Sequence, residues 1–297
     1  MKTDKPTNSR QSAYWMTGTL ASFCLMAIGA RELSGEISTP QLLFIRSLTG
    51  LMIMTAIIKS QHAPNPLNTG RFALHLIRNA SHFIGQYGWF LGITLLPLAE
   101  VFALEFTMPI WATLLALLFL NEKFTLKKIG VLAMGWIGVL IIVRPGLTLF
   151  NPAALIVLGA ALFFAISHST TKSLSETEEP SVILFYMCLI QLPIGFAFAV
   201  FDWTWPQNFQ HWLWVTCIGV TALSAHYCIT KALQEAELSA VVTMDFLRLP
   251  LITLVGFFIY NEAIDFAVIV GGALMLAANL ANLSQARHLT SPHPQNE

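Results

Sequence analysis

The sequence predicts an all-α integral membrane protein with ten transmembrane helices, arranged as two inverted five-helix repeats. Three observations lead to this prediction: a composition poor in charge, ten apolar segments of spanning length, and polar landmarks that recur at a constant offset. The chain has 297 residues, of which 55% are hydrophobic and 11% are charged, and its mean hydropathy is +0.65. Soluble domains carry about 25% charged residues, so this composition indicates that lipid is the main solvent.

Each apolar segment holds about 17–22 residues, which is enough to cross the hydrocarbon core of a bilayer as a helix. The segments are expected to begin near Tyr14, Gln41, Ala73, Ala99, Lys127, Pro152, Ser181, His211, Leu238 and Phe266. The basic start followed by an apolar run is similar to a signal peptide. However, residues 15–30 lack a small-x-small cleavage site and nine further spans follow, so the first segment is expected to be retained.

The polar landmarks of the first half recur in the second half. Gln86-Tyr87, Glu105-Phe106 and Asn121-Glu122 return 140 positions later as His226-Tyr227, Asp245-Phe246 and Asn261-Glu262. A constant offset indicates a duplicated half, and five spans per half give the halves opposite orientations. Many secondary transporters are built in this way around a midplane site. We expect a first repeat over 11–147, a second over 152–285, and a disordered cytoplasmic tail over 286–297.

The distribution of Lys and Arg predicts the orientation. If the N-terminus is cytoplasmic, twelve of these residues, Arg78 among them, fall on the cytoplasmic side, whereas Arg31 and Arg144 fall on the other. Positive charge is enriched in cytoplasmic loops, so both termini are expected in the cytoplasm. The same count requires an even number of spans and therefore supports ten.

The ends of the two halves carry the most specific motifs. The first reads Pro-Leu-Ala-Glu-Val-Phe-Ala-Leu-Glu-Phe-Thr-Met-Pro-Ile-Trp over 97–111 and is followed by a glycine-spaced segment ending at Arg144-Pro145-Gly146. The second reads Met-Asp-Phe-Leu-Arg-Leu-Pro-Leu over 244–251 and is followed by Gly271-Gly272. Over residues 15–284 the chain resembles the EamA-like families of the drug/metabolite transporter superfamily. The resemblance implies a bacterial inner-membrane protein with a central cavity that moves small metabolites without ATP or another cofactor.

Four charged residues fall inside predicted spans, where charge is costly and therefore marks functional candidates. They are Arg46, Glu105, Asp245 and Arg248. One interpretation is a structural clamp, because Asp245 and Arg248 lie three residues apart on one helical face. The other is that all four line the cavity and contact a polar cargo. Glu105 has no cation within one turn of its helix, and burial favours a protonated carboxyl, so Glu105 is expected to carry a coupling proton. The alternative is that transport is uncoupled and Glu105 is a hydrogen-bonded structural group.

The third span carries a polar stripe of Asn79, His82 and Gln86, with Tyr87 beside it. Residues at this spacing share one helical face, and we expect them to contact the cargo. A seam of hydrogen bonds between helices is the alternative. His226, the repeat-mate of Gln86, is a further candidate for cargo binding, with a buried structural histidine as its alternative.

Pro109 and Pro250 fall in the fourth and ninth spans, where each is expected to bend the helix and shape a cavity or a hinge. Gly88 and Gly92 form a small-x-x-x-small pattern that permits close contact between helices. Asn121-Glu122 and Asn261-Glu262 stand where spans end and are expected to serve mainly as helix-end and turn residues.

The sequence therefore predicts a secondary-active transporter of a small polar or amphipathic metabolite, working by alternating access. A vitamin such as riboflavin, an amino acid, a nucleoside or an S-adenosylmethionine-like compound would suit. The alternatives are a membrane-embedded lipid- or prenyl-modifying enzyme and a non-transporting scaffold. The enzyme is disfavoured because the four aspartates are scattered at Asp4, Asp202, Asp245 and Asp265.

The expected partners are the metabolite and the lipid bilayer. The zero net charge predicts no nucleic-acid partner. The four cysteines are not spaced as a zinc or redox pair, so no metal site is expected. The identity of the cargo, the direction of transport, the coupling ion and the oligomeric state, a homodimer included, stay open.

Overall fold

The structure is a computed structural model that describes residues 9–60, 69–119, 126–144, 151–174, 177–235, 241 and 244–290. All regular elements in this part of the chain are helices. Six of its segments are long and apolar enough to span a membrane, and three further apolar helices are shorter. The predicted all-α membrane fold is confirmed.

The helices of the first half are α1 (Ser9–Glu32), α2 (Thr39–Ser60), α3 (Phe72–Leu95), α4 (Leu98–Glu105), α5 (Met108–Phe119) and α6 (Leu126–Val143). Those of the second half are α7 (Ala153–Leu174), α8 (Pro180–Ala199), α9 (Phe209–Glu235), α11 (Arg248–Tyr260) and α12 (Phe266–Thr290). The predicted start near Leu238 lies outside the described residues. The tail predicted from residue 286 is wrong for 286–290, because α12 continues to Thr290; residues 291–297 also lie outside.

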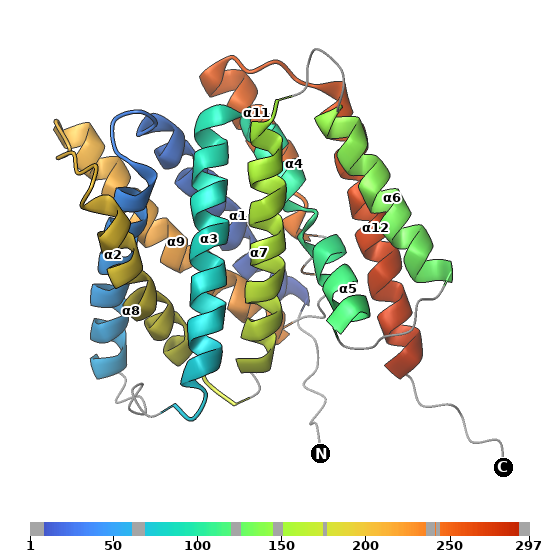
Figure 1. Ribbon diagram of the computed structural model, residues 1–297, viewed down its shortest axis with the longest axis horizontal. Helices are drawn as coiled ribbons and strands as arrows, with labels where there is room; N and C mark the ends of the chain where they lie inside the picture. Colours follow the sequence, from blue (N-terminus) through green and yellow to red (C-terminus); the bar gives the residue numbers. More distant parts are fainter. Residues whose placement is uncertain are drawn as a thin grey trace.

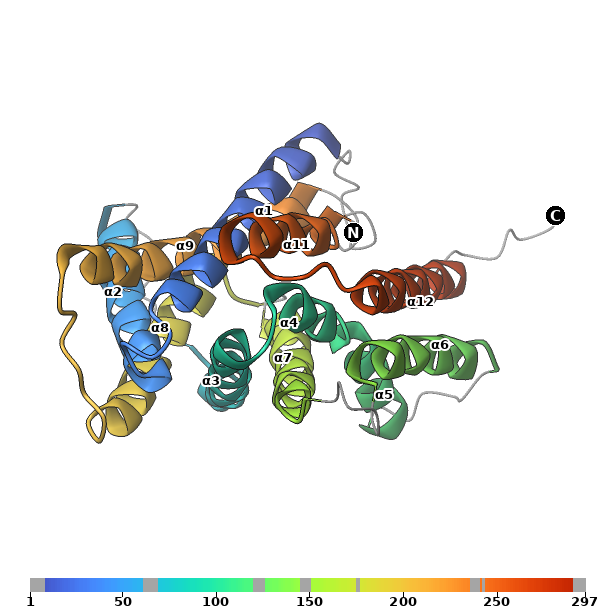
Figure 2. The same ribbon diagram turned by 90° about the horizontal axis from the view of Figure 1, so that it is seen from above.

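The packing of the helices follows the inverted repeat (Figures 1 and 2). Helix α1 packs on α9, and α3 packs on α7, so exchanging the two halves converts one pair into the other. The other major pairs, α2 with α8 and α6 with α12, each join equivalent helices of the two halves. These two pairs lie at opposite ends of the molecule in Figure 2. A pseudo-two-fold axis therefore passes through both of these pairs, across the helix axes, as expected for an inverted repeat.

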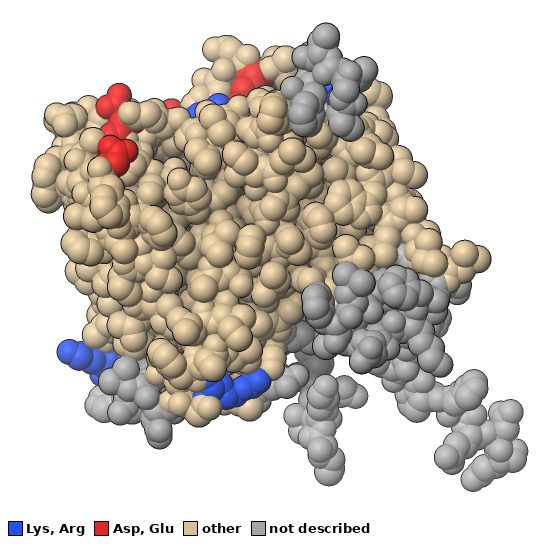
Figure 3. Space-filling view, viewed as in Figure 1, with Lys and Arg blue, Asp and Glu red and all other residues tan. Residues whose placement is uncertain are grey.

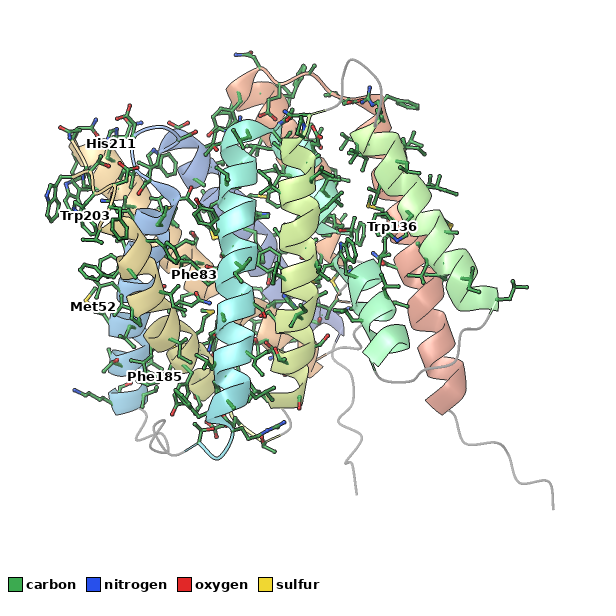
Figure 4. The ribbon with its side chains drawn as sticks, viewed as in Figure 1. Met52, Phe83, Trp136, Phe185, Trp203 and His211 are labelled. Atoms are coloured by element: carbon green, nitrogen blue, oxygen red, sulfur yellow. The ribbon has the colours of Figure 1, made fainter. Side chains whose placement is uncertain are left out.

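A band without charged side chains crosses the face shown in Figure 3. The larger patches of Lys and Arg lie below the band, whereas the visible Asp and Glu lie above it together with smaller patches of Lys and Arg. Trp203 and His211 lie at the upper end, near the start of α9 (Figure 4), and Trp203 packs edge-on against Trp205 with 5.6 Å between ring centroids. Tryptophans at this height are typical of the boundary between lipid and water.

One residue of the predicted charge asymmetry is placed differently. Arg78 was expected at the cytoplasmic end of the third span, but its side chain is buried, with 4% relative exposure. Its Nε donates to Thr171 Oγ1 at 3.1 Å, and its Nη1 donates to Asn79 Oδ1 at 2.6 Å. Arg78 is therefore a core residue that belongs with the buried charges and not with the cytoplasmic ones.

The fourth span is broken into two helices at the middle of the bundle. Helix α4 ends at Glu105 and α5 begins at Met108; in the second half a turn at 246–247 precedes α11 in the same way. The prolines were expected to bend continuous helices, but Pro109 and Pro250 lie in the first turn of α5 and of α11. A first-turn residue needs no amide donor, so these prolines start new helices and do not kink old ones.

Small residues bring α3 against α7. An added Cβ at Gly88 would lie 3.2 Å from the carbonyl oxygen of Ile156, and one at Gly92 would lie 2.4 Å from the Val157 side chain. The expected close contact along this glycine pattern is therefore confirmed. This contact fixes the face of α3 that meets α7, and the stripe residues His82 and Gln86, on other positions of the helix, line a cavity inside the bundle.

The end of the ninth span has the expected turn chemistry. Asn261 caps α11 in the left-handed conformation, with φ 53°, and its amide donates to the Gly256 carbonyl. Glu262 forms an ion pair with Arg31 at 3.1 Å and accepts from the Leu98 amide at 2.9 Å. Glu262 therefore joins the second half to two helices of the first half. The equivalent Asn121-Glu122 lies outside the described residues.

Candidate functional site

A cavity of about 150 Å³ lies between the two halves, at the level of the broken span. Cavities of about this size hold a benzene-sized ring. Helices of both repeats contribute to its wall, which carries six of the eight predicted cargo-binding residues: Arg46, His82, Gln86, His226, Asp245 and Arg248. Glu105, the predicted proton carrier, also lines it.

Arg248 is the centre of the first polar group in this cavity. Its Nη2 donates to Asp245 Oδ2 at 2.5 Å, and its Nη1 lies 3.3 Å from Glu105 Oε1. The indole nitrogen of Trp89 donates to the second oxygen of Glu105 at 2.8 Å. The predicted bridge between Asp245 and Arg248 is confirmed. We call Arg248, Asp245, Glu105 and Trp89 the Arg248 cluster.

Aromatic rings surround the Arg248 guanidinium. Its central carbon lies 4.5 Å from the ring centroid of Phe23, 5.0 Å from that of Phe106 and 5.6 Å from that of Phe102. A cation over aromatic faces is attracted by their negative quadrupole, and more strongly so away from water. Together with the two carboxylates, these rings hold Arg248 in one position.

The reason given for Glu105 as proton carrier is wrong. The sequence shows no cation within one turn of Glu105, but the fold brings Arg248 against it from the other half of the chain. Glu105 and Asp245 therefore share one cation. A nearby cation therefore does not distinguish Glu105, as a proton carrier, from Asp245, as an ionised clamp residue.

Arg46 is the centre of the second polar group. Its Nη1 donates to Gln86 Oε1, and the Gln86 amide nitrogen contacts His82 Nδ1. Gln191 reaches the same ring nitrogen at 3.0 Å. Arg46 is 4% exposed, and no carboxylate in the described part of the chain forms an ion pair with it. We call Arg46, Gln86, His82 and Gln191 the Arg46 cluster.

The pseudo-two-fold axis passes through this site. Phe106 and its repeat-mate Phe246 stack face to face, with 4.2 Å between centroids and 17° between planes. His226, the mate of Gln86, packs edge-on against His82 at 5.2 Å. Residues that are equivalent in the two halves thus meet at the centre, where a cargo would be in contact with both halves.

Two predicted binding residues lie elsewhere. Asn79 is buried below the cavity wall, where its amide nitrogen donates to the Tyr186 carbonyl of α8 at 3.3 Å. Asn79 therefore belongs to the seam between helices that was the alternative interpretation of the stripe. Tyr87 is 40% exposed and points to the outside of the bundle. It follows Gln86 by one residue, so it is rotated by about 100° around the helix, away from the stripe.

Trp89, His168, Phe23 and Phe164 line the cavity but were not among the predicted binding residues. Trp89 had a usable signal, because it lies three residues after Gln86 and continues the polar stripe of α3. His168 lines the cavity from α7 and is exposed. Phe23 and Phe164 supply aromatic walls, and nothing in the sequence distinguishes them from the many lipid-facing phenylalanines.

The chemistry of these groups is that of binding. No cluster of His, Cys, Asp or Glu suited to a metal ion exists among the described residues. The cavity combines hydrogen-bond donors and acceptors with aromatic faces, a typical lining for a small-molecule site.

Comparisons with known proteins agree with this architecture. The model of the EamA-like transporter family matches residues 11–144 and 151–283, one match per half. A riboflavin transporter of Vibrio cholerae is 29% identical, covering 90% of each chain. An S-adenosylmethionine uptake transporter of Rickettsia prowazekii is 23% identical over 94% of this chain and 95% of its own. A solved structure titled only as a crystal structure of protein covers 94% of this chain and 99% of its own, at 17% identity and a TM-score of 0.66, which shows the shared fold.

Proposed function

Because this chain belongs to the EamA-like transporter family, we propose that it moves a small metabolite by alternating access of the central cavity to the two sides of the membrane. Relatives over nearly the whole chain are named transporters, so it is a transporter and not an enzyme. The observation that carries the proposal is the position of the cavity. It lies on the axis that relates two inverted halves, so rocking one half against the other would open it to either side.

The cargo we propose contains a flat ring and polar groups. The aromatic residues Phe23, Trp89 and Phe164 line the cavity beside the two arginine clusters. Riboflavin and S-adenosylmethionine, the compounds named for the relatives, both combine a ring system with polar groups. The volume of about 150 Å³ matches one ring rather than a whole molecule of this kind. We therefore propose that the cavity widens when the cargo enters.

The contacts at the upper end of the bundle support a state that is closed on that side. Glu262 binds both Arg31 at the end of α1 and the amide of Leu98 at the start of α4, which ties the halves together there. His168, which lines the cavity from the lower part of α7, is exposed. We propose that the lower end, which carries the larger patches of Lys and Arg in Figure 3, is cytoplasmic, and that this state faces the cytoplasm.

Counterflow in proteoliposomes tests the function directly. Purified protein in vesicles loaded with unlabelled riboflavin or S-adenosylmethionine should accumulate the same compound in labelled form faster than vesicles without protein. An imposed pH gradient, applied in a parallel series, tests whether protons drive the transport. If neither compound nor a wider panel of metabolites shows counterflow, the proposal is wrong.

Topology is tested with reporters in a bacterial inner membrane. Fusions after Glu297 and after Pro64 should report cytoplasm, and a fusion after Arg144 should report periplasm. A periplasmic signal at Glu297 would contradict the orientation and the even number of spans.

A further inference from the structure

The buried charges among the described residues do not balance. Arg46, Arg78 and Arg248 are each 4% exposed, and the two carboxylates beside them, Glu105 and Asp245, both bind Arg248. This part of the molecule therefore holds one more cation than anion. Burying a charge away from water costs a large free energy unless an opposite charge or hydrogen bonds compensate it. Arg46 is the cation that lines the cavity without a carboxylate partner in the described chain.

Three groups of the cavity also lack hydrogen-bond partners among the described residues. Arg46 Nε and Arg248 Nε are buried donors without an acceptor, and Asp245 Oδ1 is a buried acceptor without a donor. An unmade hydrogen bond to a buried group costs about 1–3 kcal/mol, and more for a charged group. A void of about 10 Å³ beside Arg46 has room for roughly one water. Such a water would accept from Arg46, but it carries no charge, so the cation would stay uncompensated.

Negative charge is in excess at the Arg248 cluster, because two carboxylates share one guanidinium. The two clusters attach to neighbouring positions of α3. Gln86 binds Arg46 and Trp89 binds Glu105, and residues three apart are separated by about 4.5 Å along a helix axis. The cavity is therefore positive on one side and negative a short distance away.

We propose that the cargo of this cavity carries a carboxylate and a protonated amine close together, as an α-amino acid group does. The carboxylate binds the Arg46 guanidinium, where a planar pair of oxygens matches the fork of donors. The ammonium donates to Asp245 Oδ1, and the ring attached to these groups lies between Phe23 and Phe164. This inference rests on the proposed transport function and selects the zwitterionic members of its substrate class.

The test compares cargoes that share a ring and differ in charge. Counterflow is measured for tryptophan, for tryptamine, which lacks the carboxylate, and for 3-indolepropionate, which lacks the amine. S-Adenosylmethionine, which carries both groups, and riboflavin, which carries neither, are measured in parallel. The protein with its natural sequence should move at least one of the two zwitterions, at least about tenfold faster than the compounds lacking either group.

Variants then test whether Arg46 is responsible for the preference for zwitterionic cargoes. Arg46→Gln should remove it, because the amide cannot pair with a carboxylate, whereas Arg46→Lys should retain part of it. Lys59→Gln, on the same helix but exposed at its end, removes a cation outside the cavity and should leave transport unchanged. Gel filtration and thermal unfolding in detergent show whether each variant is folded.

The outcomes distinguish a failure of this inference from a failure of the proposed transport function. Counterflow of riboflavin or tryptamine as fast as that of the zwitterions overturns the inference and leaves a transporter. A folded Arg46→Gln protein that keeps the preference for zwitterions also overturns it. If none of the five compounds moves, the inference is wrong, and the wider metabolite panel then decides the proposed function.

Discussion

Arg248 and Arg46 line the same cavity, but protein carboxylates bind only Arg248. Arg248 has two carboxylates within 3.3 Å and three aromatic rings around it. Arg46 has the amide oxygen of Gln86. The difference indicates different tasks, because a cation that the fold has already neutralised stabilises the bundle, whereas one left without an anion is available to a ligand. Burial alone does not separate them, since both side chains are 4% exposed.

The largest effect is expected when the Arg248 cluster loses its cation. Arg248→Gln leaves Glu105 and Asp245 without a counter-charge, and removing one partner of a buried ion pair costs about 3–5 kcal/mol. The free energy of unfolding in detergent measures this loss. Arg46→Gln is the matched control and should change it by only about 1 kcal/mol, because no carboxylate is left unpaired. Equal losses in the two variants would mean that both arginines are structural.

The second largest effect is expected when Arg46 is given a carboxylate partner, as Arg248 already has. Gln86→Glu places a carboxylate where Arg46 now meets an amide oxygen. We expect transport of a carboxylate-bearing cargo to fall at least about tenfold, because the protein's own anion occupies the guanidinium. The stability of the variant should rise, since a charge-assisted hydrogen bond is stronger than a neutral one. Counterflow and thermal unfolding of the same preparation measure both. Unchanged transport in a stabilised variant would exclude Arg46 from the cargo site.

A smaller effect is expected at Glu105. Glu105→Gln leaves Arg248 paired one-to-one with Asp245 and keeps an oxygen for Trp89, so the unfolding free energy should fall by about 1 kcal/mol. If Glu105 carries a coupling proton, the variant should also lose the acceleration given by a pH gradient while still exchanging cargo for cargo. Glu100→Gln, on the same helix but outside the cavity, is the control. A protein that ignores the gradient in its natural sequence would rule out proton coupling.

The smallest effect is expected at Trp89. Trp89→Phe keeps the aromatic wall and removes the donor to Glu105, and hydrogen bonds between membrane helices average about 0.6 kcal/mol. Trp111→Phe is the control, because its indole nitrogen has no hydrogen-bond partner among the described residues. Equal changes in unfolding free energy would show that ring packing, and not the bond to Glu105, is measured.

Much of the candidate site was predictable because α3 obeys helical periodicity. The spacing of His82 and Gln86 placed them on one face, and the same rule extends to Trp89, which was not among the predicted residues. Tyr87 was a wrong choice on the same rule, since it follows Gln86 by one residue and faces outward. Asn79 has the right face but lies at another depth, where α8 covers it. Depth along a helix depends on its neighbours, and periodicity carries no information about them.

By itself, the sequence determined the membrane fold, the two repeats and most of the polar residues that face the cavity. These follow from local properties: hydropathy over a span, a constant offset, and the cost of polar groups in lipid. Only the tertiary structure decided which charges pair. Glu105 and Arg248 are 143 positions apart, and their contact exists because the inverted halves meet at the axis. An ion pair depends on distances of a few ångströms, so only the packing of the two halves could show that Arg248 is neutralised and that Arg46 is not.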